Sequence, residues 1–261
     1  MRAMAIGATG MLAQQMTVEV ISNNIANIST NGFKRQRAEF KDLLYENIRR
    51  PGSQSSDTGT IVPTGIQIGN GVATGSVYRI NLQGSIEQTG NALDLAVSGR
   101  GLLQVQTPDG TTAYTRAGSL QLNSSGQIVT SDGYTILPNI TVPADTIDIT
   151  INASGQVFAK IDGQVTLTNL GQIQLANFPN PAGLEAIGDN LLRETPASGT
   201  ATVGNPNSNG FGKLLQASLE KSNVDIVQEL TNLITAQRAY EMNSRVIKSA
   251  DEMMSALSQL R

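Results

Sequence analysis

The last forty residues of the chain constrain its fold more than any other stretch. From Ser222 to Arg261 the sequence contains neither glycine nor proline, the residues that most often interrupt a helix. Apolar or small residues recur there at steps of three and four, which is the helical period. They are Ile226, Leu230, Leu233, Ala236, Tyr240, Ile247, Ala250, Met254 and Leu257, with Val227, Ile234, Val246, Met253 and Leu260 at their flanks. Such a helix spans roughly 55 Å at about 1.5 Å per residue, so we expect part of its apolar stripe to face something outside the chain.

The sequence also indicates where this helix begins. Asn223 is predicted to be its N-cap, because a short polar side chain can accept a hydrogen bond from an unpaired amide of the first turn. Asp225 adds negative charge near the positive end of the helix dipole, and Arg261 lies at the opposite end, where positive charge is favourable. We therefore predict one helix over 222–261.

A second helical pattern opens the chain. Apolar residues repeat the same spacing from Met4 to Ile28, and Gly32 follows where a left-handed glycine can close a helix. Two amphipathic helices therefore bracket the sequence. Their spacing alone leaves two alternatives open: the helices pair antiparallel along a shared seam, or they form a two-helix cap on a globular domain.

Between these helices the hydrophobic period changes to two, which is typical of half-buried β-strands. The alternation is clear in Leu93–Val97, Leu103–Gln106, Leu120–Leu122 and Ile147–Ile151. Hairpin turn pairs with suitable stereochemistry separate such runs, namely Asp109-Gly110, Asp132-Gly133 and Asp162-Gly163. From Val72 to about Phe178 we therefore predict an antiparallel meander or a small β sandwich.

Three less regular stretches complete the chain. Ile61 to Gly71 alternates too often with Gly and Pro for a central strand and fits an extended edge segment. Leu184 to Leu192 is predicted to hold one short helix. Ser198 to Gly212, rich in Gly, Asn, Ser and Thr, is expected to form a surface loop.

Asn123-Ser124-Ser125 matches a glycosylation sequon, but an asparagine in a turn explains it more simply.

The composition argues against catalysis. The sequence has no His and no Cys, so it lacks the usual general base at neutral pH, a thiol nucleophile and the commonest transition-metal ligands. Its acidic residues are scattered singly, and Asp94 and Asp148 are expected to point outward from strands. Asp145 and Asp148 lack the further oxygen ligands of a calcium loop. We predict that the protein is not an enzyme and has no catalytic residue and no metal site.

The sequence also gives little support for a nucleotide cofactor, for nucleic acid or for a membrane as a ligand. Gly7 to Ala13 imitates a dinucleotide-binding turn, but too few residues precede it for a strand, and Asn27 and Ser29 stand where the acidic partner is expected. We therefore predict no cofactor. The formal net charge of −3 gives no electrostatic reason to expect nucleic acid. No apolar run approaches the ~18 residues of a membrane span, so we expect no direct membrane insertion.

Three separated motifs point to a family. The first is Ser22 to Lys34, in which Ser22 stands where alanine is usual. The second comprises Leu93–Val97 and Tyr114–Gly118. The third comprises Ser222-Asn223-Val224, Glu229-Leu230, Gln237-Arg238-Ala239-Tyr240-Glu241 and Asn243. In this order they resemble the axial proteins of the bacterial flagellum, the family of rod and hook subunits.

Within that family, Tyr45 to Gly69 resembles the segment that distinguishes distal rod subunits. A proximal rod subunit or a hook-type subunit is the alternative, and the modest β region argues against the larger hook subunit. The resemblance marks as rod-specific the residues Arg50, Pro51, Gly52, Ser53, Gln54, Gly65, Ile66, Gln67, Ile68 and Gly69.

The resemblance, joined to the patterns above, implies an α+β fold. A discontinuous terminal helical domain, with the N- and C-terminal helices paired as an antiparallel coiled coil, would carry an inserted, mostly antiparallel β domain. The expected parts are an N-terminal helix (1–32), a connecting segment with the rod-type extended stretch (33–71), a β-rich outer domain (72–197), a return segment (198–221) and a C-terminal helix (222–261).

The resemblance also implies a function. Subunits would polymerise helically into a rigid hollow drive shaft that transmits torque from motor to hook and serves as an export channel. The expected partners are copies of the same chain, proximal rod subunits below, hook subunits above, the surrounding P-ring and L-ring proteins, and the flagellar export apparatus. The expected location is the flagellar basal body, in the rod that spans the periplasm, reached without a cleaved signal peptide because the unfolded N-terminus itself is read for export.

The residues expected at subunit interfaces lie on both terminal helices. They are Met11, Val18, Asn23, Asn24, Ile25, Asn27, Phe33, Leu230, Ile234, Gln237, Arg238, Tyr240, Asn243, Ile247 and Met254. Two other classes of protein compete with this interpretation. One is a monomeric secreted β-domain adhesin or binding module with the helices as a local cap, and the other is a carboxylate-based hydrolase.

Overall fold

The computed structural model describes residues 2–52 and 64–259 of the 261-residue chain. These residues divide into two compact units. The first, here called the helical unit, comprises the described residues within Met1–Ile25, Gln36–Tyr78 and Asp225–Arg261. The second, here called the β unit, comprises Ala26–Arg35 and Arg79–Val224.

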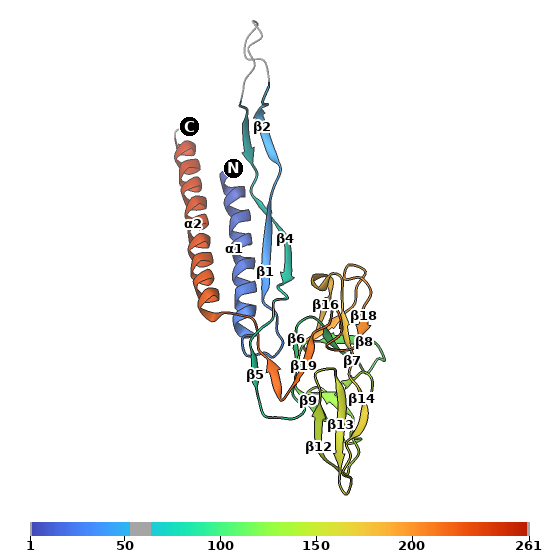
Figure 1. Ribbon diagram of the computed structural model, residues 1–261. Helices are drawn as coiled ribbons and strands as arrows, with labels where there is room; N and C mark the ends of the chain where they lie inside the picture. The colour runs from blue at the N-terminus through green and yellow to red at the C-terminus, as the bar shows by residue number, and fades with distance from the viewer. Residues whose placement is uncertain (1, 53–63, 260–261) are drawn as a thin grey trace. The chain divides into compact units, whose positions relative to one another are not determined.

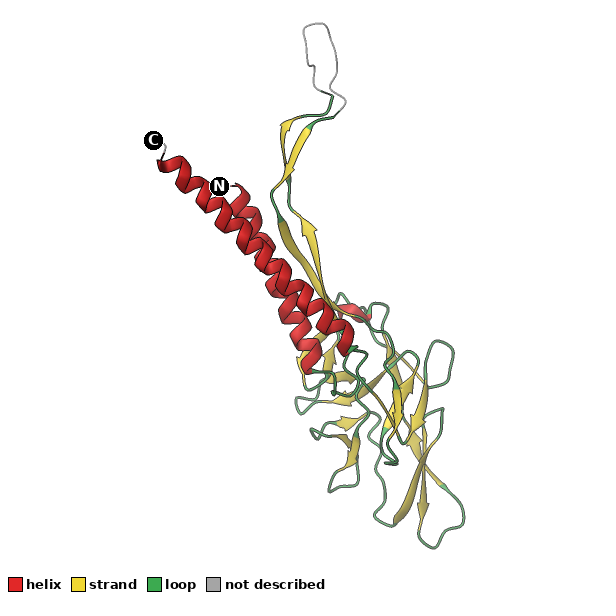
Figure 2. Cartoon of the chain, turned by 90° about the vertical axis from the view of Figure 1, so that its left-hand side faces the viewer, coloured by secondary structure: helices red, strands yellow, loops and turns green. Residues whose placement is uncertain are grey.

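The helical unit contains two long helices and four strands among its described residues. Its elements are α1 (Arg2–Ala26), β1 (Gln36–Asp42), β2 (Tyr45–Arg49), β3 (Ile66–Gly69), β4 (Val72–Arg79) and α2 (Ile226–Gln259). The two helices lie side by side and run antiparallel (Figures 1 and 2). No helix in the described part of the chain is long and apolar enough to cross a membrane.

The helix α2 begins later than the sequence suggested, so the prediction of Asn223 as N-cap is wrong. The backbone amides of Val227 and Gln228 donate to Asp225 Oδ1 at 2.9 and 3.3 Å, which makes Asp225 the cap. Asn223 instead bridges backbone groups of the β unit: its Oδ1 accepts from Arg35 N at 2.7 Å, and its Nδ2 donates to Ile80 O at 2.9 Å. A side chain so engaged is not free to turn toward the helix.

The four strands of the helical unit form two two-stranded sheets. Strand β1 pairs with β4, and β2 pairs antiparallel with β3 in the register Tyr45↔Gly69 and Asn47↔Gln67. The Gln67 side chain donates to Asn47 Oδ1 at 2.7 Å across that hairpin. The predicted extended edge segment is confirmed for its described residues, because β3 is a strand of a two-stranded sheet.

The β unit is built from many short strands. Its elements are β5 (Ile86–Gln88), β6 (Leu95–Ser98), β7 (Leu102–Gln106), β8 (Thr112–Thr115), β9 (Leu120–Leu122), β10 (Ile128–Thr130), β11 (Thr135–Ile136), β12 (Thr146–Ile151), β13 (Gln156–Ile161), β14 (Thr168–Gln172), β15 (Leu175–Asn177), the 3-10 turn η1 (Pro181–Gly183), β16 (Glu185–Gly188), β17 (Leu191–Arg193), β18 (Thr202–Gly204), β19 (Lys213–Gln216) and β20 (Ser218–Glu220). The largest sheet has the order β16-β17-β8-β7-β11-β10-β9, with β15 joining β7 to β18.

Antiparallel pairing dominates this unit, as predicted. β7 pairs antiparallel with β8, β11 and β15, and β13 pairs antiparallel with β12 and β14. The core beneath these sheets is aliphatic, and its fully buried members include Leu95, Leu103, Val105, Val157, Ile173 and Leu175. Period-two alternation in the sequence therefore located these strands but not all of their buried side chains. Ala96 and Gln104 are buried at 1% and 8% exposure, whereas Leu122 and Ile147 are exposed at 41% and 64%.

The predicted turns are also confirmed. Gly110, Gly133 and Gly163 have φ values of 76°, 89° and 76°, so each Asp-Gly pair places its glycine in the left-handed region that other residues avoid. Asn123 Oδ1 accepts from the amides of Ser125 and Gln127, both at 2.9 Å, which is an asparagine turn.

Two expectations for the later part of the β unit are wrong. Leu184 to Leu192 forms no helix but the hairpin β16–β17, because Asp189 and Asn190, at φ 51° and 58°, form the tight two-residue turn that suits a right-twisted hairpin. The stretch from Ser198 to Gly212 is not wholly a loop, since β18 within it pairs with β15. Local composition could not reveal either pairing partner.

The position of the cap gives a first prediction. Asp225→Ala should lower the free energy of unfolding of the helical unit by about 1 kcal/mol, because two first-turn amides lose their acceptor. Denaturant titration followed by far-UV circular dichroism measures this loss. Asp225→Asn is the control and should retain most of the stability, since asparagine caps as well as aspartate. An unchanged midpoint for the alanine variant would contradict the assignment.

Candidate functional site: the helix pair and the closure of the β unit

One face of α2 packs on α1 within the chain. Its covered positions follow each other at steps of three and four or their sum, as in a heptad seam. They include Glu229, Leu233, Ala236, Ala239, Asn243, Ile247 and Ala250. Glu229, Ala236 and Ala250 are almost completely buried, at 1%, 3% and 6% exposure. The alternative of antiparallel pairing along a seam is the one that the structure adopts.

Glycines of α1 set how closely the helices approach. A Cβ atom on Gly7 would lie 2.8 Å from Ile247 Cγ1, and one on Gly10 would lie 2.8 Å from Asn243 Nδ2. Both distances are shorter than real Cβ contacts, so a larger residue would force the Ile247 or Asn243 side chain to shift. The stretch that imitates a nucleotide-binding turn therefore serves helix packing.

A polar contact fixes the register of the pair at its other end. Asn24, 1% exposed, donates from Nδ2 to Glu229 Oε2 at 3.2 Å and to Gln36 O at 2.9 Å, and its Oδ1 accepts from Gln36 N at 2.8 Å. It thereby joins α1 to both α2 and β1. Seventeen residues separate Gly7 from Asn24 and eighteen separate Glu229 from Ile247, so one antiparallel register holds along the seam.

The rest of α2 leaves large apolar side chains exposed. Two groups of these follow helical spacing away from the seam. The N-terminal patch of α2 consists of Val227, Leu230 and Ile234, at 70%, 44% and 51% exposure. The C-terminal patch consists of Met242, Val246 and Met253, at 59%, 46% and 61% exposure. Among the described residues of α1, by contrast, Leu12 alone is a large hydrophobic residue of this kind.

The predicted interface residues divide between these two environments. Asn24, Asn243 and Ile247 face the partner helix of the same chain. The exposed members on α2 are Leu230, Ile234, Gln237, Arg238, Tyr240 and Met254. Among these, Tyr240 and Met254 keep the three-and-four spacing of the seam. Asn23 is exposed, and the remaining five, Met11, Val18, Ile25, Asn27 and Phe33, are half-buried. Their contact with other subunits stays a prediction. The set omitted Val227, Met242, Val246 and Met253, which continue the helical stripe on its outer side.

The rod-specific residues lie on and beside the β2–β3 hairpin. Arg50, Pro51 and Gly52 follow β2, while Gly65 precedes β3 and Ile66–Gly69 forms it. Ser53 and Gln54 lie outside the described residues. The hairpin exposes Tyr45 and Ile48 on β2, and Ile66 on β3, at 53%, 59% and 51%. An ion pair between Arg2 and Glu46, 2.5 Å apart, connects the base of the hairpin to α1.

In the β unit, Glu220 joins the first and last strands to the core. Its Oε1 accepts from Lys34 Nζ at 2.5 Å and from Gly84 N at 2.9 Å, and its Oε2 accepts from Arg116 Nε at 2.5 Å. The Glu220 side chain is only 1% exposed. Arg116 also donates to three backbone carbonyls, those of Gly101, Val97 and Gly99, so its charge is fully partnered by oxygen.

Burial and the neighbouring charges shift the pKa values of Lys34 and Glu220 in opposite directions. Desolvation lowers the pKa of Lys34, although Glu220 counteracts it. Desolvation alone would raise the pKa of Glu220, but Arg116 and Lys34, with the Gly84 amide, together hold that pKa below its usual value of 4.5. Glu220 is therefore held as a carboxylate.

Gly32 makes a further contact with Glu220, through the backbone. At φ 71° it adopts the left-handed conformation expected of it, and its amide donates to Glu220 O at 2.8 Å. A Cβ atom there would lie 2.7 Å from the carbonyl carbon of Arg116. The first sequence motif and the second, which contains Arg116, thus meet at Glu220. Sequence reasoning did not select Glu220, since a single acid in a strand carries no periodic signal.

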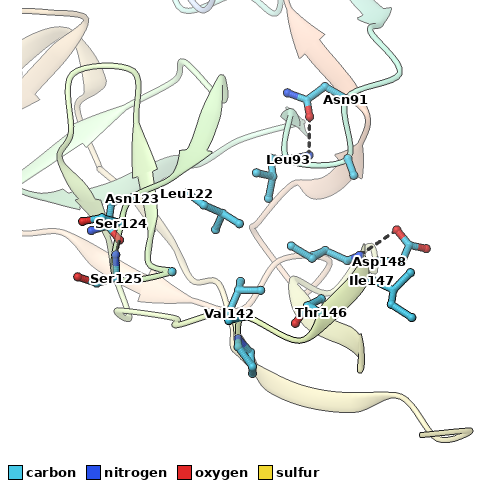
Figure 3. Close-up of a pocket in the computed structure, with 15 residues that line it drawn as sticks. Asn91, Leu93, Leu122, Asn123, Ser124, Ser125, Val142, Thr146, Ile147 and Asp148 are labelled. Atoms are coloured by element: carbon cyan, nitrogen blue, oxygen red, sulfur yellow. Dashed lines mark hydrogen bonds between the residues drawn. The ribbon is translucent and has the colours of Figure 1, made fainter. Parts of the chain in front are cut away.

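The β unit also holds an open groove of about 600 Å³ (Figure 3). Its lining includes Leu93, Leu122 and Val142, and the one carboxylate among its lining residues is that of Asp148. Asp148 Oδ1 accepts from the amide of Ile149 at 2.9 Å. A lone carboxylate lacks the second group that acid–base catalysis needs. Asp148 is exposed as expected, whereas the prediction that Asp94 points outward is wrong: Asp94 is 6% exposed and accepts from Thr89 Oγ1 at 2.6 Å.

Comparisons with known proteins agree with this geometry. Residues 4–34 match the family "Flagella basal body rod protein", residues 96–159 match "Flagellar hook protein FlgE/F/G D1 domain", and residues 215–260 match "Flagellar basal body rod FlgEFG protein C-terminal". These ranges contain α1, much of the β unit and α2.

Full-length relatives support the same assignment. Proteins named "Flagellar basal-body rod protein FlgG" are 61% identical in Caulobacter vibrioides over the whole of both chains and 54% identical in Agrobacterium fabrum over 99% of each. The Bacillus subtilis protein of that name is 38% identical over 100% of this chain and 99% of its own. The chain belongs to the flagellar basal-body rod protein family.

The closeness of the helices gives a second prediction. Gly7→Val should lower the stability of the helical unit by about 1–3 kcal/mol, because its side chain meets Ile247. Ala5→Val, at an exposed position of the same helix, is the control: its propensity change is the less favourable of the two, because alanine is a better helix former than glycine, yet it should cost less. Thermal unfolding followed by far-UV circular dichroism measures both. Equal effects of the two substitutions would show that the close approach is absent.

The buried cluster gives a third prediction. Glu220→Gln should destabilise the β unit by about 3–5 kcal/mol, because two buried cations lose their carboxylate. The matched control is Glu87→Gln, which removes an exposed ion pair with Lys221 and should cost less than about 1 kcal/mol. Denaturant unfolding followed by near-UV circular dichroism reports on the unit, and similar midpoints for both variants would contradict the role of Glu220.

The same variant has a pH signature. Because the pKa of folded Glu220 lies below the unfolded value, its stabilisation is complete above the unfolded pKa and is lost as pH falls through the folded pKa. The wild-type protein should therefore lose stability in acid more steeply than Glu220→Gln.

Proposed function

We propose that the chain is a structural subunit of the flagellar distal rod and that it polymerises helically into a rigid hollow shaft. In this proposal the shaft transmits torque from motor to hook and serves as the export channel. The observation that carries it is the exposed apolar surface of α2, in a chain whose relatives are basal-body rod proteins.

The exposed surface of α2 exceeds what its partner helix can cover. α2 has 34 residues and α1 has 25, and the seam uses only one side of α2. Within each patch the apolar side chains follow one another along the helix rather than lying scattered, and a contiguous apolar patch of this kind marks an interaction site. Copies of the same chain are the occupants that a rod subunit would find there. A head-to-tail contact of this kind, if it does not close into a ring, builds a helical polymer.

The chemistry of the chain fits a structural role. The sequence contains neither His nor Cys. Its buried charges, Glu220, Lys34 and Arg116, are engaged with each other and with backbone groups, so they hold the fold rather than act on a substrate. We therefore propose that the protein is not an enzyme.

The finer assignments follow from the family rather than from a measured contact. The partners that we propose are proximal rod subunits below, hook subunits above, the P-ring and L-ring proteins around the shaft, and the export apparatus. The proposed location is the rod segment that spans the periplasm, reached by export without a cleaved signal peptide. The β2–β3 hairpin, with its exposed apolar side chains, would bridge neighbouring subunits and stiffen the tube.

The fourth prediction tests polymerisation. The double variant Leu230→Ser/Ile234→Ser should raise the protein concentration needed for assembly by on the order of tenfold or more, because each subunit loses apolar contact area. Sedimentation and electron microscopy of concentrated protein measure this. The stability of the dispersed chain should change little, since both side chains are about half exposed there.

A matched control comes from the β unit. Ile187→Ser/Val203→Ser changes two apolar side chains of similar exposure, 43% and 46%, outside the proposed contact. This variant should assemble at a concentration closer to that of the wild type. Equal assembly of both variants would show that α2 is not the contact surface, and a wild-type chain that stays monomeric at every concentration would favour the binding module.

The fifth prediction concerns the hairpin. Replacing residues 45–69 by a short turn that joins β1 to β4 should leave polymers that bend more easily, because the proposed bridge between subunits is removed. Curvature of the polymers in electron micrographs gives the stiffness. Polymers as straight as those of the wild type would show that the hairpin does not stiffen the tube.

A further inference from the structure

Every methionine of this chain lies in the first 16 or the last 20 residues of the sequence. They are Met1, Met4, Met11, Met16, Met242, Met253 and Met254. Six lie in α1 or α2, and Met1 lies outside the described residues. The chain has no Cys, His or Trp. Methionine thioethers are therefore its readily oxidised side chains, and they are absent from residues 17–241.

The methionines of the two helices differ in accessibility. Met4, Met11 and Met16 on α1 are half-buried. Met242, Met253 and Met254 on α2 are 59%, 61% and 43% exposed. Met242 and Met253 are eleven residues apart, which is close to three helical turns, so they lie on one side of α2 about 16 Å apart with Val246 between them. They are the sulfur-bearing members of the C-terminal patch. Met254 lies seven residues after Ile247, on the side of the seam and outside this patch.

We infer that Met242 and Met253 form an oxidation-sensitive site, and that its conversion to the sulfoxide by hydrogen peroxide prevents self-association. The inference rests on the proposed function, in which copies of the chain cover this patch. It adds a dependence of self-association on methionine oxidation, which rod assembly alone does not require.

The reaction is a two-electron oxygen transfer. The sulfur lone pair attacks one peroxide oxygen, the O–O bond breaks, and an S–O bond forms. After proton transfer the other oxygen leaves as water, so the thioether is oxidised to a sulfoxide and the peroxide is reduced. Each sulfoxide replaces a flexible apolar side chain by a polar one, whose oxygen needs a hydrogen-bond partner when it is buried.

The consequence depends on the assembly state. In the dispersed chain both sulfur atoms belong to exposed side chains and peroxide reaches them. In a polymer that covers the patch, the same sulfur atoms are shielded. The subunit is thus vulnerable before assembly and protected after it, and two sulfoxides should raise the concentration needed for assembly by on the order of tenfold or more.

The test treats the full-length chain with hydrogen peroxide, once dispersed and once as preformed polymer, and locates sulfoxides by peptide mass spectrometry. Met242 and Met253 should oxidise faster than Met4, Met11 and Met16 in the dispersed chain and should be protected in the polymer. The oxidised dispersed chain should then fail to assemble at the concentration at which untreated protein does. Equal oxidation of Met242 and Met253 in both states, or unimpaired assembly with sulfoxide at both positions, would overturn the inference.

Matched variants separate this site from damage elsewhere. Each variant is compared with its own untreated sample, so that any effect of leucine on assembly itself cancels. Both variants carry Met254→Leu as a common background, because Met254 is itself 43% exposed. Met242→Leu/Met253→Leu should keep its assembly after peroxide, while Met4→Leu/Met16→Leu should lose it as the wild type does. Loss of assembly to the same degree in both variants would overturn the inference. Failure of untreated wild-type chain to assemble is a different result, since it would reject the proposed function and the inference with it.

Discussion

The constraint on which the helical unit depends is that one helix cannot cover the whole of a longer neighbour. Gly7 and Gly10 let α1 approach α2 closely, and Asn24 fixes the register through Glu229. This contact buries the seam side of α2 against α1 and leaves the two apolar patches of α2 exposed. Packing stabilises most protein helices, because isolated helices are marginal in water. Burial of the exposed patches would therefore stabilise α2 further, and the single chain does not bury them.

The β unit, in contrast, completes itself. Its aliphatic core is fully buried, and Glu220 joins Lys34 and Arg116 with a carboxylate that these cations keep ionised. Gly32 is required where the chain passes the Arg116 backbone, since any side chain would clash there. This unit can thus hold its first and last segments in place without help from another molecule, whereas the outer surface of α2 cannot be buried within the chain.

Periodicity revealed most of this architecture. The helical ends, the antiparallel strands and the Asp-Gly turns follow from spacing alone, because each depends on local geometry. The failure at Leu184–Leu192 is local, because the Asp189-Asn190 turn makes it a hairpin. Other failures depend on partners distant in sequence, since Asn223 bonds to Arg35 and Ile80 rather than capping α2. Glu220 was missed for the same reason. The predicted interface mixed residues that face α1 with residues that face outward, since spacing shows a stripe but not which side another helix of the same chain occupies.

Membership of the basal-body rod family gives the unsatisfied surface of α2 a natural occupant, namely further copies of the chain. The central claim is that α2 gains its full stability only when those copies cover it. Amide hydrogen exchange, measured residue by residue on dispersed chain and on polymer, tests the claim most directly. The account predicts equal protection of the β unit in both states and a large rise in protection along α2 on assembly. Full protection of α2 in the dispersed chain, unchanged in the polymer, would contradict it.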